Sequence, residues 1–133
     1  MTKEQFLQST IDYYSVDPYN RRCHRDHGCK YSPENAGKEG KSEGCAIGRH
    51  LTPEVQKKLD ESQGIISDII TYKSLKQLLP EWMQEMDPDF LDQVQLLHDT
   101  SSSWEPNGLS ERGKERVNTI INKFNLSMLL FKL

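Results

Sequence analysis

The sequence predicts an α+β fold: a mostly helical single domain over residues 1–133 with one small β-hairpin. Three observations predict it. Apolar residues recur at helical spacing in several segments, most of which begin at a capping residue or a proline. A polar, glycine-rich stretch separates two short apolar segments, as in a hairpin with a long tip. The length of 133 residues is sufficient to bury one core.

The first helix is expected over residues 3–14, where apolar side chains recur on one face. These residues are Phe6, Leu7, Ile11 and Tyr14. Pro18 disfavours helix at the residue before it, so the segment "VDPYN" should end this helix.

The hairpin is expected next, between two short strands. "CKYS" at residues 29–32 and "CAIGRHL" at residues 45–51 would form the strands, and "PENAGKEGKSEG" would form the loop between them. The loop contains three glycines and is otherwise mostly polar, which is typical of a long hairpin tip.

Helices are expected from there to the C-terminus. Thr52 suits an N-cap and Pro53 the first helical position. Residues 64–79 read as strand or helix, with helix favoured over "SLKQLL", and Pro80 ends or restarts that element. "DPDFLDQVQLLHD" begins with an acidic cap, "SSSWEPNG" is expected to be a loop, and a last helix should begin at Ser110.

Charge is distributed unevenly along the chain. The net charge is −3, yet residues 19–58 carry +4 and residues 59–111 carry −9. The total therefore gives no argument for or against nucleic acid. The acidic middle and its basic flanks could pair within the fold or between protomers, or simply be solvated helical faces.

The chain is expected to be cytoplasmic and to have no membrane span. It contains no run of eighteen apolar residues, and "MTKEQFLQSTIDYY" lacks the apolar core of a signal peptide. In that compartment three cysteines are expected to be thiols or metal ligands. The apolar ending "NLSMLLFKL" suggests an oligomer contact.

An ordered set of short motifs resembles a group of small, mostly uncharacterised phage and bacterial proteins. That group has a Cys-x-Tyr strand, a Cys-Ala-(Val/Ile)-Gly strand, a helix start containing proline, and a downstream Leu-Gln-x-x-His-Asp helix. The matching positions are Cys29, Tyr31, Cys45, Ala46, Ile47, Gly48, Leu51, Pro53, Gln95, His98 and Asp99. The resemblance implies the hairpin-and-helix fold and a phage context, in which the chain would act in the cytoplasm of the host cell. It implies no activity.

A cluster of thiols and imidazoles is the first candidate site. Zinc binds four Cys or His ligands, and four candidates are present: Cys23, His27, Cys29 and Cys45. No Cys-x2-Cys pair occurs, which favours the alternative that Cys29 and Cys45 are small core residues on facing strands. Catalysis by Cys23 lacks an orienting group, and His98 is expected to be structural, near the end of its helix.

A basic segment with nearby tyrosines is the second candidate site. Guanidinium groups and aromatic rings suit phosphates and bases. The candidate binding residues are Arg21, Arg22, Arg25, Lys30, Tyr31, Arg49 and His50, with Tyr13, Tyr14 and Tyr19 close in sequence. The alternative is a solvated basic surface. No Walker A motif or dinucleotide fingerprint is present.

Together these features predict a non-enzymatic binding protein of phage type that acts through residues 19–50. Its partner would be a host protein or a nucleotide-like anion, which makes it a candidate antagonist of host defence. The alternatives are a regulator that binds nucleic acid and a small enzyme that depends on zinc or a thiol. No cofactor other than zinc is indicated.

Overall fold

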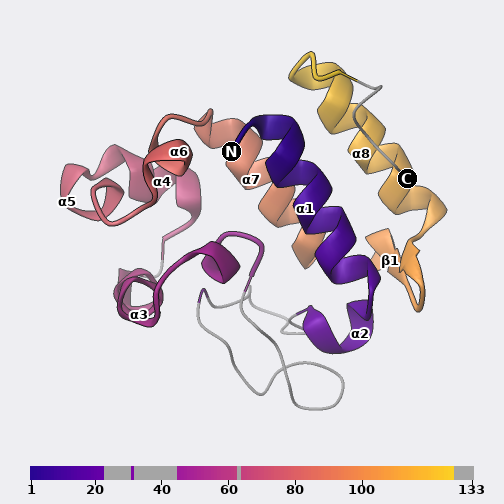
Figure 1. Cartoon of the computed structure of the whole chain (residues 1–133), viewed down its shortest axis with the longest axis horizontal. Helices are drawn as coiled ribbons and strands as arrows, with labels where there is room; N and C mark the ends of the chain where they lie inside the picture. The colour runs from indigo at the N-terminus through magenta and orange to yellow at the C-terminus, as the bar shows by residue number, and fades with distance from the viewer. Residues whose placement is uncertain (23–30, 32–44, 63, 128–133) are drawn as a thin grey trace.

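The computed structural model describes residues 1–22, 31, 45–62 and 64–127 (Figure 1). Within these residues the fold is mostly helical and carries one two-stranded antiparallel sheet, which confirms the predicted class. No helix among them is long and apolar enough to cross a bilayer. The elements are α1 Lys3–Ser15, α2 Pro18–Arg21, η1 Gly48–His50, α3 Pro53–Ser62, α4 Ile66–Thr71, α5 Lys73–Lys76, α6 Glu81–Gln84, α7 Pro88–Asp99, η2 Ser101–Ser103, β1 Trp104–Glu105, β2 Gly108–Leu109 and α8 Glu111–Lys123.

The longer helices begin at side-chain caps. Thr2 and Gln5 form a reciprocal capping box at the start of α1, since each side chain accepts the backbone N–H of the other residue. Asp87 caps α7 through the N–H of Asp89 at 2.9 Å, and Ser110 caps α8. These caps confirm the predicted starts of α7 and α8, because each satisfies an N–H that has no partner inside its helix.

The apolar segment between α3 and α7 forms three short helices. Residues 64–79, which the sequence left as strand or helix, are helical in two pieces, because Tyr72 has an extended backbone at the junction of α4 and α5. Pro80 precedes α6, so the helix restarts there as its sequence suggested. Helix α4 packs along α7, and this contact attaches the segment of short helices α4 to α6 to the central helices.

The hairpin lies elsewhere than predicted. Residues 45–51 form a turn and the 3-10 helix η1, so the prediction of a strand there is wrong, and Tyr31 lies in a bend. Cys45 explains the difference, since its carbonyl accepts the N–H of Arg49 at 3.0 Å in a local helical turn. The other residues of the predicted first strand and its loop lie outside the described residues.

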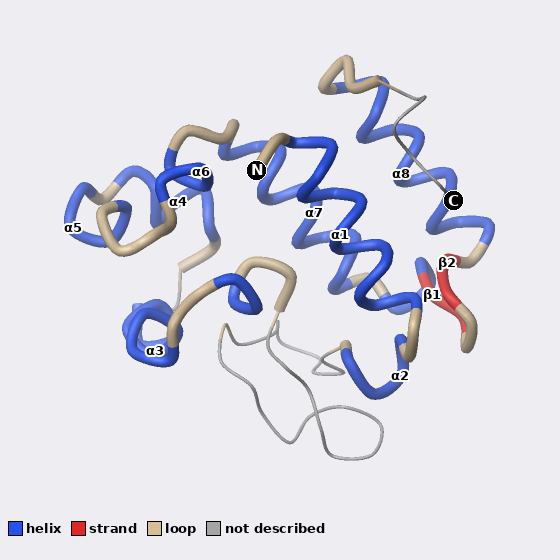
Figure 2. Tube along the Cα trace, in the orientation of Figure 1, coloured by secondary structure: helices blue, strands red, loops and turns tan. Residues whose placement is uncertain are grey.

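The observed strands β1 and β2 come from the segment predicted to be a loop. Trp104 pairs with Leu109 and Glu105 with Gly108, and Figure 2 shows this short ribbon beside α8. Gly108 has a positive φ of 144°, a backbone conformation that favours glycine at the turn. A two-residue strand has too short a pattern to be recognised from alternation.

The core joins α1, α7 and α8 to the inner faces of the shorter helices. Helices α1, α7 and α8 run side by side in Figure 1, and α7 packs against both neighbours. Fully or nearly fully buried residues from every part of the described chain meet there, including Phe6, Leu7, Ile47, Leu59, Ile69, Met83, Phe90, Leu91, Val94, Leu97, Val117 and Ile121. Burial of these side chains is the main source of stability.

Candidate binding surface

Arg21 and Arg49 lie over the same tyrosine ring. The Cζ atom of Arg21 is 4.4 Å from the centroid of Tyr13, and that of Arg49 is 4.6 Å from it. Both distances are within the range of a cation–π contact. The two arginines are 28 positions apart in sequence and come from α2 and η1, so the fold brings them together on α1.

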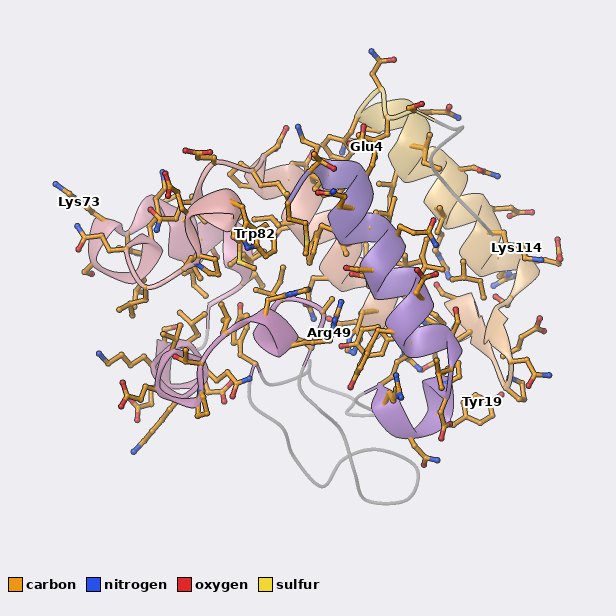
Figure 3. The ribbon with its side chains drawn as sticks, viewed as in Figure 1. Glu4, Tyr19, Arg49, Lys73, Trp82 and Lys114 are labelled. Carbon is orange, nitrogen blue, oxygen red and sulfur yellow. The ribbon has the colours of Figure 1, made fainter. Side chains whose placement is uncertain are left out.

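Hydrogen bonds to α1 hold both guanidinium groups in place. Arg21 Nη1 donates to the carbonyl oxygen of Tyr13 at 2.9 Å, and Arg49 Nη2 lies 3.3 Å from Ser9 Oγ. Ser9 and Tyr13 are four residues apart on α1, so they lie on one face of the helix. Figure 3 shows Arg49 between η1 and α1. This face of α1 therefore carries two fixed positive charges.

The nearest acidic candidate in sequence does not neutralise Arg21. Asp17 lies four residues before Arg21, yet its Oδ2 accepts from Asn20 Nδ2 at 2.8 Å. Within the described residues no carboxylate lies within ion-pair distance of Arg21. Its side-chain hydrogen bond and its ring contact both go to Tyr13. Arg21 thus brings a positive charge to this surface that Asp17 does not offset.

Arg22 points the other way, into the fold. Its exposed fraction is 1%, and its Nε donates to the carbonyl oxygen of His98 at 2.6 Å. Its Nη2 donates to the carbonyl oxygen of Asp99 at 3.3 Å. Burial lowers the pKa of the guanidinium, which nevertheless stays protonated at neutral pH. Arg22 is therefore engaged inside the domain and does not belong to the surface of Arg21 and Arg49.

His50 is packed among aromatic rings. Its ring centroid lies 5.4 Å from those of Phe6 and Trp82, and its buried Nε2 has no hydrogen-bond partner among the described residues. Burial, with the charge of Arg49 as a second cause, lowers the pKa of His50 to about 4. Trp82, one of these two rings, is labelled in Figure 3. His50 is therefore neutral near pH 7 and does not add charge to the surface.

The backbone of Tyr31 packs directly against Gly48. A Cβ at position 48 would overlap the carbonyl oxygen of Tyr31, so only glycine fits there. Tyr31 is buried, and its backbone N–H and hydroxyl donate to Asp60 Oδ1 at 2.7 Å and to the carbonyl of Gly64 at 2.8 Å. Burial raises the pKa of its hydroxyl. Tyr31 thus fastens the turn to α3.

Cys45 is a core thiol in the same turn. Its exposed fraction is 0%, which confirms that it packs as a small core residue. The N–H of Gly48 donates to its Sγ at 3.3 Å, yet burial outweighs this bond and raises the pKa of the thiol to about 12. Within the described residues no group of three or more Cys, His, Asp or Glu side chains is placed to hold a metal.

The buried His98 pairs with the partly exposed Asp99 at the end of α7. His98 Nδ1 lies 2.7 Å from Asp99 Oδ1, and Gln95 Nε2 donates to the same oxygen at 2.9 Å. Gln95 Oε1 in turn accepts the N–H of Ile47 at 3.3 Å. Tyr14 packs on the imidazole with a ring separation of 4.7 Å. The carbonyls near this end accept from Arg22 and from Trp104, and His98 itself is fully buried, in keeping with the expected structural role.

Several positions of the resemblance meet in this network. Tyr31, Cys45, Ile47 and Gly48 touch one another or α7, and Gln95, His98 and Asp99 form the α7 side. These contacts give the shared residues a structural role. Five predicted site residues, Cys23, Arg25, His27, Cys29 and Lys30, lie outside the described residues, as does the ending 128–133.

Comparisons with family profiles, with curated proteins and with solved structures gave no match to this chain. The resemblance to phage and bacterial proteins therefore stays a prediction. Sequence reasoning named both surface arginines and the nearby tyrosines, but it missed Ser9. The spacing of Ser9 and Tyr13 on one face of α1 is the signal that points to it.

Proposed function

We propose that this chain is a non-enzymatic accessory protein of phage type that binds a host protein or a nucleotide-like anion in the host cytoplasm. In that role it would antagonise host defence or redirect another host process by stoichiometric binding. The observation that carries the proposal is the placement of Arg21 and Arg49 over the ring of Tyr13.

The surface suits binding because its charges are held before a partner arrives. Each arginine has a hydrogen bond to α1 and a ring contact, so less side-chain freedom is lost when an anionic partner binds. Arginine forks also recognise carboxylate and phosphate groups in fixed geometry. An acidic protein surface presents carboxylates and a nucleotide presents phosphates, so this surface suits both kinds of partner.

A catalytic role has less support from the described residues. Cys45 is fully buried and its thiol is protonated near neutral pH, which does not suit a nucleophile. The imidazole of His98 is fully buried against Tyr14, and its Nδ1 is 2.7 Å from Asp99 Oδ1. A zinc site involving Cys23, His27 and Cys29 stays a prediction, since these residues lie outside the described ones.

Site-specific photo-crosslinking tests the protein partner. Val16 is 67% exposed and lies three residues after Tyr13, on the same side of α1, so it is a suitable position for a photoreactive phenylalanine. Tyr72 is 63% exposed at the junction of α4 and α5 and serves as the matched control. We expect a defined host-protein adduct from position 16 and none from position 72.

The charge dependence of that adduct decides the matter. The double variant Arg21→Gln/Arg49→Gln should abolish the adduct, and the purified partner should bind the wild-type chain directly in a calorimetric titration. For the small-anion alternative, ATP should bind the wild-type chain and not the double variant. If the adduct and the binding of ATP are both the same in the double variant as in the wild type, the proposal is wrong.

The nucleic-acid alternative gives a different signature. Binding through phosphates weakens steeply as salt rises, so a duplex that binds at 50 mM salt should be released by 200 mM salt. The acidic segment 59–111, with a net charge of −9, opposes such binding over much of the chain. Retention of a duplex without retention of ATP or a host protein would favour the regulator instead.

A further inference from the structure

We infer that Asn107, in the turn between β1 and β2, is a site of spontaneous covalent modification, at which the folded chain loses ammonia and converts to isoaspartate and aspartate. The inference goes beyond the proposed function and uses neither Arg21 nor Arg49. The reaction needs only the chain and water, so it would give the protein a limited chemical lifetime.

Asn107 is the one asparagine of the sequence that precedes a glycine. The backbone nitrogen of the next residue can reach the side-chain amide carbon of an asparagine, because these two atoms close a five-membered ring. A side chain on the next residue hinders this approach, and glycine carries none. The other asparagines are followed by larger residues, which are Arg21, Ala36, Thr119, Lys123 and Leu126.

The reaction balances without a cofactor. The nitrogen of Gly108 bonds to Cγ of Asn107, the bond from Cγ to the side-chain nitrogen breaks, and that nitrogen leaves as ammonia with the proton of the Gly108 nitrogen. A cyclic imide remains, and water opens it. Cleavage between the Gly108 nitrogen and Cγ gives aspartate. Cleavage between that nitrogen and the main-chain carbonyl carbon gives isoaspartate, in which the main chain runs through the side-chain carbons.

The Asn107 side chain can rotate into the position for attack. Asn107 is exposed, and its amide makes no hydrogen bond within the described residues. Asn20 differs, since its Nδ2 donates to Asp17 Oδ2 at 2.8 Å. Asn122 is also exposed, yet it lies inside α8, where helical hydrogen bonds hold the backbone. Of these three asparagines, only Asn107 combines an unheld amide with a turn.

The ribbon that holds Gly108 is very short (Figure 2). Gly108 pairs with Glu105 beside the turn, and Trp104 with Leu109 is the only other strand pair in the described part of the chain. A two-stranded ribbon of this length has little stability of its own, so the pair beside the turn opens in local fluctuations. Opening lets the backbone rotate at Asn107, which brings the Gly108 nitrogen towards Cγ.

Isoaspartate in this turn would disturb the start of α8. It adds one carbon to the main chain between β1 and β2, so the register of the two strand pairs cannot be kept. Strand β2 leads directly into Ser110, whose N–H donates to the carbonyl of Ser103 at 2.9 Å and whose Oγ accepts from the N–H of Gly113 at 3.1 Å. A shift of β2 would therefore weaken the N-cap of α8 and destabilise the fold.

Peptide mapping by mass spectrometry tests the inference on the folded full chain. The chain would be incubated at pH 7, 8 and 9 and digested at intervals. We expect the peptide that contains Asn107 to gain about 1 Da, the difference between an amide and an acid, with fragment ions that identify isoaspartate. The rate should rise in proportion to hydroxide, because the attacking nitrogen must lose its proton.

Asn122 is the internal control in the same samples, because it is exposed but helical. Its peptide should keep its mass over the period in which Asn107 reacts. No gain of mass at Asn107, or an equal rate at Asn122, would overturn the inference.

Variants then separate this site from general ageing of the chain. Asn107→Gln places the amide one carbon further from the backbone, so ring closure slows, and Asn122→Gln is the matched control. After incubation at pH 9, the wild type and Asn122→Gln should melt at a lower temperature than before, while Asn107→Gln should keep its melting temperature. Equal losses in Asn107→Gln and the wild type would contradict the role of the turn.

The variant Asn107→Asp identifies which product destabilises the fold. It carries the new charge but keeps the ordinary main chain, so when freshly prepared it should melt close to the fresh wild type. The aged wild type should melt below both. If fresh Asn107→Asp melts as low as the aged wild type, the charge is the cause, and the inferred disturbance by the added carbon is wrong.

Discussion

Arg22 Nε donates to the carbonyl oxygen of His98 at 2.6 Å, and so joins two residues 76 positions apart. The same guanidinium bonds the carbonyl of Asp99, and Trp104 Nε1 donates to the carbonyl of Leu97 at 3.0 Å. The backbone N–H of Thr100 donates to the carbonyl oxygen of Leu96 at 3.0 Å. The last four carbonyls of α7 therefore all have donors, two of them supplied by one distant arginine.

Removing Arg22 should destabilise the domain. Arg22→Met keeps much of the side-chain volume but leaves the carbonyls of His98 and Asp99 buried without these donors. We expect the free energy of unfolding to fall by about 2–4 kcal/mol, measured by urea denaturation. Arg112→Met is the control, with an expected change within about 0.5 kcal/mol at its exposed site. Equal stability of Arg22→Met and Arg112→Met would show that Arg22 does not stabilise the fold.

Gly48 should not tolerate a side chain. In Gly48→Ala the new methyl group would overlap the backbone of Tyr31, which cannot move away cheaply. We expect a loss of about 3 kcal/mol or failure to fold. In Gly64→Ala the nearest atom is Ile69 Cγ1 at 3.3 Å, a side-chain atom, so the loss should stay below about 1 kcal/mol. Thermal unfolding followed by circular dichroism compares Gly48→Ala with Gly64→Ala. Equal melting temperatures of these variants would contradict the close contact between Gly48 and the backbone of Tyr31.

The thiol of Cys45 should be unreactive in the native state. In the variant Cys23→Ser/Cys29→Ser it is the sole thiol, and its raised pKa of about 12 leaves little thiolate at pH 8. We expect iodoacetamide to react at least about 100-fold more slowly with the folded chain than with the chain in urea. Mass spectrometry of timed samples gives both rates. Comparable rates would mean that the thiol is exposed or ionised.

Acid should weaken the fold through His50. Its folded pKa of about 4 lies below its ordinary value of 6.5, so between these values the unfolded chain binds more protons. Stability from the neutral imidazole is present above pH 6.5 and is lost as pH falls towards 4. We expect the free energy of unfolding of the wild type to fall more steeply over this window than that of His50→Gln. Parallel pH profiles would show that His50 titrates normally.

Local signals were sufficient to predict the longer helices. The starts of α7 and α8 rest on Asp87 and Ser110, whose side chains act on residues two or three positions away. The apolar residues that form the buried face of α1 all lie within the helix itself. Because such interactions lie within one helix, the sequence alone contains them.

Contacts between distant segments could not be predicted in the same way. The apolar run at Cys45 resembles a strand, yet Gly48 is packed against Tyr31 and Ile47 donates to Gln95. Similarly, Arg21 and Arg22 look equivalent in the sequence, although one faces Tyr13 and the other the end of α7. Adjacent residues point in different directions, and only the folded arrangement decides which of them is buried.

The central claim is that Arg21 and Arg49 on Tyr13 form a surface for an anionic partner. Its most direct test is native mass spectrometry of the untagged chain isolated from bacterial cytosol, beside the double variant Arg21→Gln/Arg49→Gln. We predict that the wild-type chain retains a phosphate-bearing ligand or a host protein, and that the double variant has the bare mass. A wild-type chain that retains neither, or a bound species equally retained by the double variant, would contradict the claim.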